Sequence, residues 1–464
     1  MNNEQFVQLK RMTPDQIPDI VAAQKAYFRT GATLPIAERK RALKRLRASL
    51  KKHESALTEA LWTDLHKSYE EAYLTEIGLV YAEIDTHLRH VRRWARTRCV
   101  LPSLGVMPSR CRVMTEPLGT ALIIAPWNYP VQLLLNPLVG ALSAGCTAVL
   151  KPSPYVPHVS AILEQIVTDA FQPEYVAIFQ GNRDVNTALL AQRYDLIFFT
   201  GSPVLGKVVM AAAAKNLTPV VLELGGKSPC IIDADADIEL AAKRVAWGKA
   251  LNAGQTCIAP DYLLIHESVK APFVEALKRS FTALLGDDPK QSKHFARIVS
   301  DKAFERLRSY LADGEIIFGG ETDAAERYFS PTILDSVSPT APVMTEEIFG
   351  PIFPIQTFSE IDEAVAFVVD REKPLALYYF GKNGDYVLRH TSSGGACVND
   401  TIMHITNQRM PFGGVGNSGM SAYHGEESFR AFSHRRSVVI SPTCIDVPFR
   451  YMPYKMFKFV KKLL

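Results

Sequence analysis

The sequence lacks the cysteine pattern of a zinc site or of a disulfide framework. Its 464 residues contain seven cysteines, an odd number, and no two of them are separated by only two residues. We therefore expect no metal site, no disulfides and a reducing compartment such as the cytoplasm. The seven are Cys99, Cys111, Cys146, Cys230, Cys257, Cys397 and Cys444.

Long apolar runs and a strong excess of one charge are also missing. No run of about 18 apolar residues occurs, so we expect no membrane-spanning helix, and residues 1–12 are too polar for a signal peptide. The net charge of +4 is close to balance, which argues against a dedicated nucleic-acid-binding protein. With 47% hydrophobic and 22% charged residues, a chain of this length predicts a globular enzyme of two or three domains.

The first hundred residues show helical periodicity. The predicted helices cover residues 13–30, 35–65 and 69–97. The second has a leucine stripe on one face and a very basic opposite face, which includes Arg39 and which we interpret as solvated. His87 and His90 lie three residues apart without a third metal ligand, so we interpret both as surface histidines.

Short apolar runs alternate with helical segments from residue 120 onwards. The runs cover residues 121–124, 146–150, 175–179, 196–199 and 220–222. The helices predicted between them cover residues 131–144, 156–170, 184–192 and 203–215. Buried strands joined by crossover helices predict a parallel, doubly wound sheet, which binds ligands at the carboxyl ends of its strands. A less regular alternation after residue 226 predicts a second α/β domain.

A glycine loop follows the fourth predicted strand and leads into a helix. Its spacing, from Gly201-Ser202 to Gly206, is Gly-x-x-x-x-Gly, and such a loop can bind phosphate through backbone N–H groups and the helix dipole. It is not the common dinucleotide fingerprint, and no Ser or Thr follows Lys207, as a nucleoside-triphosphate loop would require. A plain strand-to-helix turn is the alternative for this loop taken alone.

Three chemically active side chains stand beside turns or glycines. Cys257 ends the stretch 254–257, Glu223 interrupts an apolar run just before two glycines, and Asn128 follows an apolar strand. A lone cysteine is more often a buried hydrophobe, but a carboxylate in an apolar run is costly unless it is paired or functional. Thiol, carboxylate and amide together form a nucleophile, a base and an oxyanion donor.

Seven motifs in order carry a family resemblance. They lie at residues 126–130, 151–153, 199–206, 222–227, 254–257, 347–351 and 411–419. The set resembles the aldehyde dehydrogenase superfamily over about residues 20–441. The residues at 254–262, 374–378 and 411–419 resemble its class 3 branch, which includes fatty aldehyde dehydrogenases.

The resemblance implies roles for single residues. Cys257 matches the nucleophile, Glu223 the general base, and Asn128 the oxyanion donor beside the Cys257 backbone N–H. Lys151 matches the contact to the adenosine ribose. The other implied cofactor contacts are Gly201, Ser202 and Gly206 around the pyrophosphate, Glu347 and Phe349 at the nicotinamide ribose and ring, and Trp127 and Leu224. Taken alone, the acidic turn that contains Glu347 would be interpreted as a surface loop.

The implied cofactor is NAD or NADP. Many NAD-preferring members of the superfamily have Glu three residues after the lysine, where this chain has Pro154. The missing carboxylate removes repulsion against a ribose 2′-phosphate. We therefore expect that the protein uses NADP as well as NAD.

The resemblance also implies an architecture: a Rossmann-type parallel-sheet cofactor domain, a second α/β catalytic domain and a small β oligomerisation arm. The expected parts are residues 1–98 and 117–224 for the cofactor domain, 225–420 for the catalytic domain, 99–116 and 421–441 for the arm with a strand at 437–440, and 442–464 for a basic tail. We expect a homodimer. The tail over 449–464 leaves two interpretations open, an amphipathic helix at a membrane surface or a cap on a substrate entrance or partner subunit.

The expected reaction is oxidation of an aldehyde to a carboxylate, through a thiohemiacetal and a thioester on Cys257, with water activated by Glu223. The apolar residues Tyr129, Leu133 and Leu134 favour medium- to long-chain aliphatic or aromatic aldehydes. Three alternatives are a CoA-acylating dehydrogenase, which would not need Glu223, a cysteine hydrolase, which would need a His such as His266, and a non-enzymatic binding protein.

Overall fold

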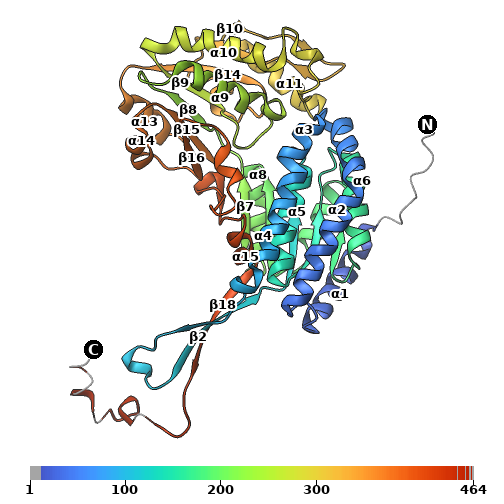
Figure 1. The fold of residues 1–464 in the computed structure, drawn as a ribbon, viewed down its shortest axis with the longest axis vertical. Coiled ribbons are helices and arrows are strands. Elements are labelled where there is room, and N and C mark those ends of the chain that lie inside the picture. Colours follow the sequence, from blue (N-terminus) through green and yellow to red (C-terminus); the bar gives the residue numbers. More distant parts are fainter. Residues whose placement is uncertain (1–11, 447, 455, 459–460, 462–464) are drawn as a thin grey trace.

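The computed structural model describes residues 12–446, 448–454, 456–458 and 461. Figure 1 shows two α/β bodies and a β arm that projects away from both. The polar residues 1–11 and part of the predicted tail, 447, 455, 459–460 and 462–464, lie outside the described residues.

The first body begins with the predicted helices. They are α1 (Ile17–Arg29), α2 (Ile36–Leu65), α3 (Tyr69–Ala72) and α4 (Gly78–Trp94). The leucine stripe of α2 is fully buried, and the helix packs against α4, α5 and α6. The third predicted helix is interrupted, because a π-helix, η2 (Tyr73–Ile77), separates α3 from α4. Single π-turns inside helices often occur at functional sites.

Two side chains assigned to the solvated surface are buried instead. Arg39 is 5% exposed, and its guanidinium donates to the carbonyl oxygens of Leu34 at 3.1 Å and Ser143 at 3.2 Å. His87 is fully buried, with Nδ1 2.7 Å from Ser143 Oγ and Nε2 3.0 Å from a Glu83 carboxylate oxygen. The surface prediction was wrong for both, because Ser143 approaches from a distant helix that local periodicity does not report.

The sheet of the first body has the order β17–β7–β6–β3–β4–β5. Its parallel strands are β3 (Thr120–Ile124), β4 (Thr147–Lys151), β5 (Val176–Ile178), β6 (Leu196–Gly201) and β7 (Val220–Leu224). The connecting helices are α5 (Pro130–Ala144), α6 (Pro157–Ala170), α7 (Arg183–Leu190) and α8 (Pro203–Ala214). The prediction of a doubly wound sheet is confirmed. The order reverses between β3 and β6, which places a ligand-binding crevice at the carboxyl ends of these strands.

The sheet of the second body has the order β10–β13–β14–β9–β8–β15–β16, and only β10 runs antiparallel to its neighbour. The strands are β8 (Pro229–Ile232), β9 (Tyr262–His266), β10 (Glu315–Phe318), β13 (Thr332–Asp335), β14 (Ile352–Phe358), β15 (Ala376–Phe380) and β16 (Gly395–Val398). The main helices are α9 (Ile238–Ala250), α10 (Lys270–Leu285), α11 (Asp301–Ser309), α13 (Ile361–Val369) and α14 (Gly384–His390).

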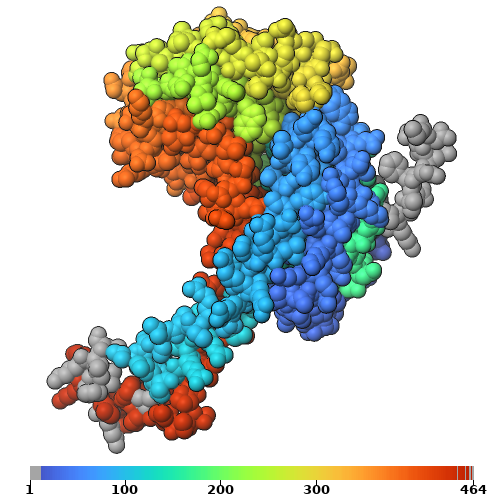
Figure 2. All heavy atoms as spheres, viewed as in Figure 1, coloured from blue at the N-terminus to red at the C-terminus, as the bar shows by residue number. Residues whose placement is uncertain are grey.

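The arm is an antiparallel sheet in the order β1–β2–β18, seen extending from the body in Figure 2. Its strands are β1 (Arg98–Val100), β2 (Arg110–Pro117) and β18 (Ser433–Ile440). The strand predicted at 437–440 is thus the second half of β18. The residues before β18 do not join the arm sheet, because β17 (Gly419–Met420) pairs with β7 and α15 (Glu426–Ala431) packs on α4 and α5. Within the described ranges, no helix is both long and apolar enough to cross a bilayer.

Candidate active site

Cys257 follows a strained turn at the end of α9. Asn252, Ala253 and Gly254 are consecutive left-handed residues, with φ of 50°, 51° and 72°. Non-glycine residues rarely adopt this conformation, so the surroundings must hold it. A Cβ on Gly254 would lie 2.3 Å from the carbonyl oxygen of Gly350, which requires glycine there. The turn presents the Cys257 thiol half-buried.

The side chain of Gln255 locks this turn. It is fully buried, and Nε2 donates to the carbonyl oxygens of Asn252 at 3.1 Å and Arg297 at 3.0 Å. Its Oε1 accepts a bond from the Val299 N–H at 3.0 Å. Both the nitrogen and the oxygen of the Gln255 side-chain amide are therefore hydrogen-bonded, two residues before the thiol.

Asn128, the predicted oxyanion donor, reaches the same turn from the first body. It follows β3, is 2% exposed, and donates from Nδ2 to the carbonyl oxygen of Gln255 at 3.1 Å. The hydroxyl of the next residue, Tyr129, lies 2.6 Å from Thr256 Oγ1. Two hydrogen bonds thus tie the loop after β3 to the residues just before Cys257.

Glu223, the predicted base, lies in β7 with 2% exposure. Neither of its carboxylate oxygens has a hydrogen-bond partner among the described residues. Burial raises the pKa of Glu223 well above its usual range. Burial, followed by the charges of Glu347 and Glu223, raises the pKa of the Cys257 thiol, so both carboxylates lie within electrostatic reach of the sulfur. An unpaired buried carboxyl near a thiol marks a functional site.

Tyr423, which the sequence did not single out, lies beside the same groups. The residue is fully buried, and its hydroxyl has no hydrogen-bond partner in the described chain. Burial and then the charges of Glu223 and Cys257 raise its pKa. The rings of Phe198 and Phe412 pack edge-on against it, with centroids at 5.2 and 5.7 Å. No motif singles out this tyrosine, so only the folded chain reveals it.

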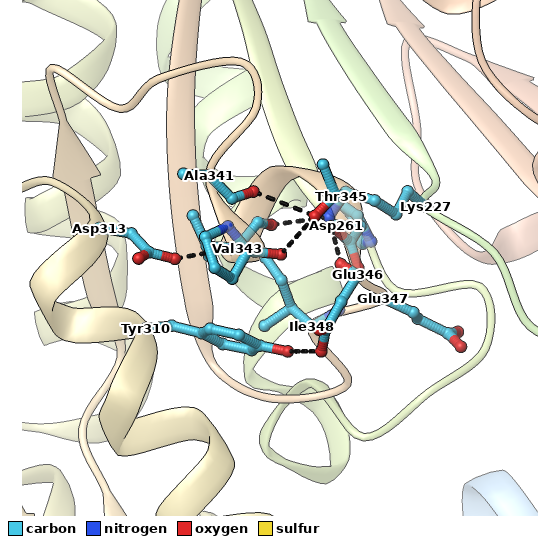
Figure 3. Close-up of polar contacts among 12 residues, drawn as sticks. Lys227, Asp261, Tyr310, Asp313, Ala341, Val343, Thr345, Glu346, Glu347 and Ile348 are labelled. Atoms are coloured by element: carbon cyan, nitrogen blue, oxygen red, sulfur yellow. Dashed lines mark hydrogen bonds and ion pairs between the residues drawn. The ribbon is translucent and has the colours of Figure 1, made fainter.

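Glu347 lies in a loop that Lys227 and Asp261 hold in place, as Figure 3 shows. The Lys227 ammonium binds the Asp261 carboxylate and donates to the carbonyl oxygen of Glu346 at 2.8 Å. Asp261 Oδ2 accepts a bond from the Ile348 N–H at 2.9 Å. In Figure 3 the Glu347 side chain points away from this cluster, so the cluster fixes the loop and leaves that carboxylate available.

Three of the predicted cofactor residues lie together at this loop. Glu347 is half-buried, its Oε1 has no partner among the described residues, and burial and then Asp261 raise its pKa to about 8. Its carboxylate packs on Gly225, where a Cβ would lie 2.1 Å from Oε2. Phe349 adopts a φ of 50°, and its ring packs edge-on against Trp127 with centroids 5.4 Å apart.

Lys151 ends β4 and is 1% exposed. Its ammonium donates to one described acceptor, the carbonyl oxygen of Pro152 at 2.8 Å, although an ammonium carries three donors. Burial lowers its pKa to about 8. A buried ammonium with one partner is suited to bind further ligand oxygens.

The predicted phosphate loop lies where β6 leads into α8. Gly201 is the last residue of β6, and Ser202 caps α8 by accepting the Leu205 N–H at 3.5 Å. A Cβ on Gly206 would lie 2.8 Å from the Leu224 side chain, so a glycine here lets α8 approach β7. The N-terminus of α8 therefore opens at the carboxyl edge of the sheet, where it can bind an anion.

A cleft of about 1180 Å³ connects part of these residues. Ser202, Gly225 and Glu347 line it, so it joins the start of α8 to the loop that carries Glu347. Lys151 and Cys257 are not among its lining residues. The structure thus groups the thiol, amide and carboxylate in one buried cluster and Ser202 and Glu347 along one cleft.

Three relatives match most of the chain. The 4,4′-diaponeurosporen-aldehyde dehydrogenase of Staphylococcus aureus (strain NCTC 8325 / PS 47) is 44% identical over 443 residues, 94% of this chain and 96% of that protein. The dimeric NADP-preferring aldehyde dehydrogenase of Canis lupus familiaris is 41% identical over 94% of this chain and 98% of its own length. Aldehyde dehydrogenase family 3 member A2 of Mus musculus is 46% identical over 89% and 86%.

A solved structure and a family model agree with these relatives. The substrate-bound state of Staphylococcus aureus AldH superposes with a TM-score of 0.94 at 43% identity, covering 96% of this chain and 99% of that one. The aldehyde dehydrogenase family model matches residues 1–438. The predicted fold and the prediction of an NAD(P)-dependent oxidoreductase acting on aldehydes are confirmed. The chain belongs to the aldehyde dehydrogenase family, in the class 3 branch that its motifs predicted.

Proposed function

We propose that Cys257 is the nucleophile, Glu223 the general base, and Asn128, with the Cys257 backbone N–H, the oxyanion donor. One observation carries this proposal. The buried Glu223 carboxylate has no hydrogen-bond partner among the described residues, yet its charge acts on the Cys257 thiol. A buried carboxyl kept free in this position is available to take up and release protons.

Each proposed step uses one of these groups. The Cys257 thiolate attacks the carbonyl carbon, and the new oxyanion accepts bonds from Asn128 and the Cys257 N–H. Collapse of this thiohemiacetal expels a hydride and leaves a thioester on the sulfur. Glu223 then removes a proton from a water molecule, whose oxygen attacks the thioester carbon, and the sulfur leaves as the carboxylate product forms. Bound NAD(P) supplies the hydride acceptor.

The predicted cofactor residues fit a dinucleotide. Glu347 offers a buried carboxylate oxygen without a partner, Lys151 offers free ammonium donors, and the start of α8 offers an anion site. We assign Lys151 to the adenosine ribose, Gly201 and Ser202 to the pyrophosphate, and Glu347 to the nicotinamide ribose. The side chains proposed to shape the remaining contacts are Trp127, Gly206, Leu224 and Phe349.

The proposed cofactor preference includes NADP. Pro154 is exposed and carries no charge three residues after Lys151, so no carboxylate at that position repels a ribose 2′-phosphate. A relative named NADP-preferring supports this choice.

The proposed substrates are medium- to long-chain aliphatic or aromatic aldehydes. Tyr129 precedes α5 and contacts the thiol loop, and Leu133 and Leu134 follow it in the helix. The three are at most 7% exposed, which provides an apolar wall. The Staphylococcus aureus relative is named after the aldehyde it acts on, 4,4′-diaponeurosporen-aldehyde. A scan of aldehyde chain length with both cofactors tests this class, because flat kcat/KM values across chain length would contradict it.

We also propose the division into a cofactor domain (1–98 and 117–224), a catalytic domain (225–420), an arm (99–116 and 421–441) and a tail (442–464). The separate sheets support it, although α15 packs on the first body. A homodimer is proposed because one relative is named dimeric and because both outer strands of the arm sheet have free edges in the monomer described here.

For the tail we propose peripheral contact of a cytoplasmic enzyme with a membrane surface. Met452 and Phe457 are 79% and 62% exposed, and the basic residues Arg450 and Lys458 lie near them in sequence. Apolar and basic side chains together favour an anionic lipid surface. Sedimentation with anionic vesicles tests this, because equal binding by a chain without residues 442–464 would contradict it.

The roles of Cys257 and Glu223 are tested by following NAD(P)H in rapid-mixing experiments. Cys257→Ala should form no NAD(P)H, while Glu223→Gln should give one burst and then stall at the thioester. Undiminished steady turnover of Glu223→Gln would place the base elsewhere. A CoA-acylating enzyme would instead show turnover that depends on added CoA in the unaltered protein.

A further inference from the structure

Lys67 and Glu76 form an ion pair in the core of the first body. Lys67 Nζ lies 2.7 Å from Glu76 Oε1, and both side chains are 0% exposed. Among the described residues, no other lysine or arginine pairs with a carboxylate when both side chains are fully buried. Burying such a pair costs a large desolvation free energy, so a specific role must explain why both residues are present.

Each partner holds one part of the loop that carries Asn128. Lys67 Nζ also donates to the carbonyl oxygen of Asn128 at 2.7 Å and lies 3.9 Å from the centre of the Tyr129 ring. Glu76 Oε2 accepts the Val131 N–H at 2.8 Å, at the start of α5. The ion pair therefore fixes the backbone on both sides of the turn after β3.

Asn252 supplies a second donor to the same carbonyl. Its Nδ2 lies 3.0 Å from the carbonyl oxygen of Asn128 and 3.0 Å from that of Gln255. The left-handed backbone of Asn252 is itself held, because its N–H donates to Glu71 Oε1 at 2.9 Å. One carbonyl of Asn128 thus receives two donors, from the first body and from the thiol turn.

The side-chain amide of Asn128 is then constrained to one orientation. One of its N–H groups donates to the carbonyl oxygen of Gln255, and the other makes no hydrogen bond to a described residue. With the backbone carbonyl and the first N–H both fixed, the second N–H has a fixed direction. A displacement of about 1 Å at such a donor is enough to lose a large part of its catalytic effect.

We propose that Lys67 is a positioning residue: paired with Glu76, it orients the Asn128 amide for the oxyanion through the Asn128 backbone carbonyl. The proposal rests on the proposed function of Asn128. Glu76 is itself a residue of the π-helix η2, so this irregular turn carries the carboxylate that binds Lys67.

A double-mutant cycle with Asn128→Ala tests the proposal. The observable is the rate of the first NAD(P)H turnover with octanal at saturating cofactor. Lys67→Met should lower this rate about ten- to a hundredfold in the otherwise unaltered enzyme, with little change in cofactor affinity. In the Asn128→Ala background, Lys67→Met should lower it by less than about twofold, because the group through which it acts is gone.

Lys249→Met is the matched control. Lys249 is also a buried lysine, 1% exposed, and its Nζ donates to the carbonyl oxygen of Pro260 at 2.9 Å and lies 4.5 Å from the centre of the Phe353 ring. Lys249 has no bond to Asn128, so Lys249→Met should change the first-turnover rate by the same factor with and without Asn128→Ala. Alkylation of Cys257 by iodoacetamide forms no oxyanion. Its rate, measured by mass spectrometry, should therefore differ by less than about twofold between Lys67→Met and the unaltered protein.

The possible results separate the two proposals. Equal effects of Lys67→Met in both backgrounds would overturn the positioning role, because a merely structural residue gives additive losses. An unchanged first-turnover rate in Asn128→Ala would overturn the oxyanion role itself. If Lys67→Met does not fold, Asn252→Gly replaces it, because it removes the second donor to the Asn128 carbonyl and keeps the left-handed backbone. This variant must then show the same non-additivity with Asn128→Ala. Additive losses of the first-turnover rate would refute the proposal.

Discussion

Four buried charged residues of the first body fall into two sets that differ in how many hydrogen-bond partners they have. Lys67 and Glu76 are fully buried, bind each other and bind backbone groups on both sides. Glu223 and Lys151 are almost as deeply buried, but Glu223 has no described partner and Lys151 has one carbonyl. Because an unsatisfied buried charge destabilises the fold, the second set must be retained for ligands and chemistry rather than for stability.

The largest expected effect compares two substitutions of the same kind, one in each set. Glu76→Gln leaves the Lys67 ammonium without its counter-charge, which should lower the free energy of unfolding by about 3–5 kcal/mol. Glu223→Gln replaces a carboxyl that burial already disfavours as an anion, so stability should stay equal or rise. Urea unfolding of both variants beside the unaltered protein measures the difference.

A similar loss of stability in Glu76→Gln and Glu223→Gln would contradict the distinction between the two sets. Glu363→Gln is a suitable control, because Glu363 is a carboxylate at an exposed helix start, with its bonds to the Ser359 backbone and side chain. Its loss should be well under that of Glu76→Gln.

The next effect concerns Lys151, the lysine of the second set. Lys151→Met removes an ammonium that burial disfavours, so the melting temperature should not fall, while affinity for NAD(P) should drop about tenfold or more through lost bonds to a charged donor. Titration calorimetry with both cofactors measures this. Unchanged affinity for NAD and NADP would remove Lys151 from the cofactor site.

Sequence reasoning worked well where the signal was local or carried by a motif. The apolar runs from β3 to β7 are buried on both faces by crossover helices, so a continuous apolar pattern was sufficient to predict them. Cys257, Glu223 and Asn128 each lie beside a turn or glycines, and the structure groups them as their motifs suggested.

The Lys67–Glu76 pair could not be predicted in this way. Nine residues separate the two, and at about 100° per residue an uninterrupted α-helix would place them on opposite faces. His66 instead ends α2 in a left-handed conformation, so Lys67 lies outside any helix, and Glu76 lies within the π-helix η2. His87 was misassigned for a related reason, because its partner Ser143 lies on another helix.

A smaller effect is expected from Glu347, which resembles the second set because its Oε1 has no partner among the described residues. Its pKa of about 8 lies above the usual 4.5, so between these values the folded protein holds a proton that the unfolded chain has lost. The free energy of unfolding should therefore fall as the pH rises from about 4.5 to about 8, by at most roughly 1.4 kcal/mol per pH unit from this group. Glu347→Gln should flatten the fall, measured by urea unfolding at several pH values. Parallel curves for both proteins would show that Glu347 ionises freely.

The smallest expected effect tests whether the uncharged Pro154, three residues after Lys151, permits the use of NADP. Pro154→Glu places a carboxylate on an exposed position three residues after Lys151. A carboxylate there repels a 2′-phosphate by about 1 kcal/mol under solvent screening, so the dissociation constant for NADP should rise about fivefold. Affinity for NAD, which lacks that phosphate, should change by less than twofold, and both are measured by the same calorimetric titration. Pro154→Gln is the matched neutral control, because it changes the backbone equally and adds no charge. If it weakens NADP binding as much as Pro154→Glu does, the effect comes from losing the proline ring, and the charge argument for NADP use fails.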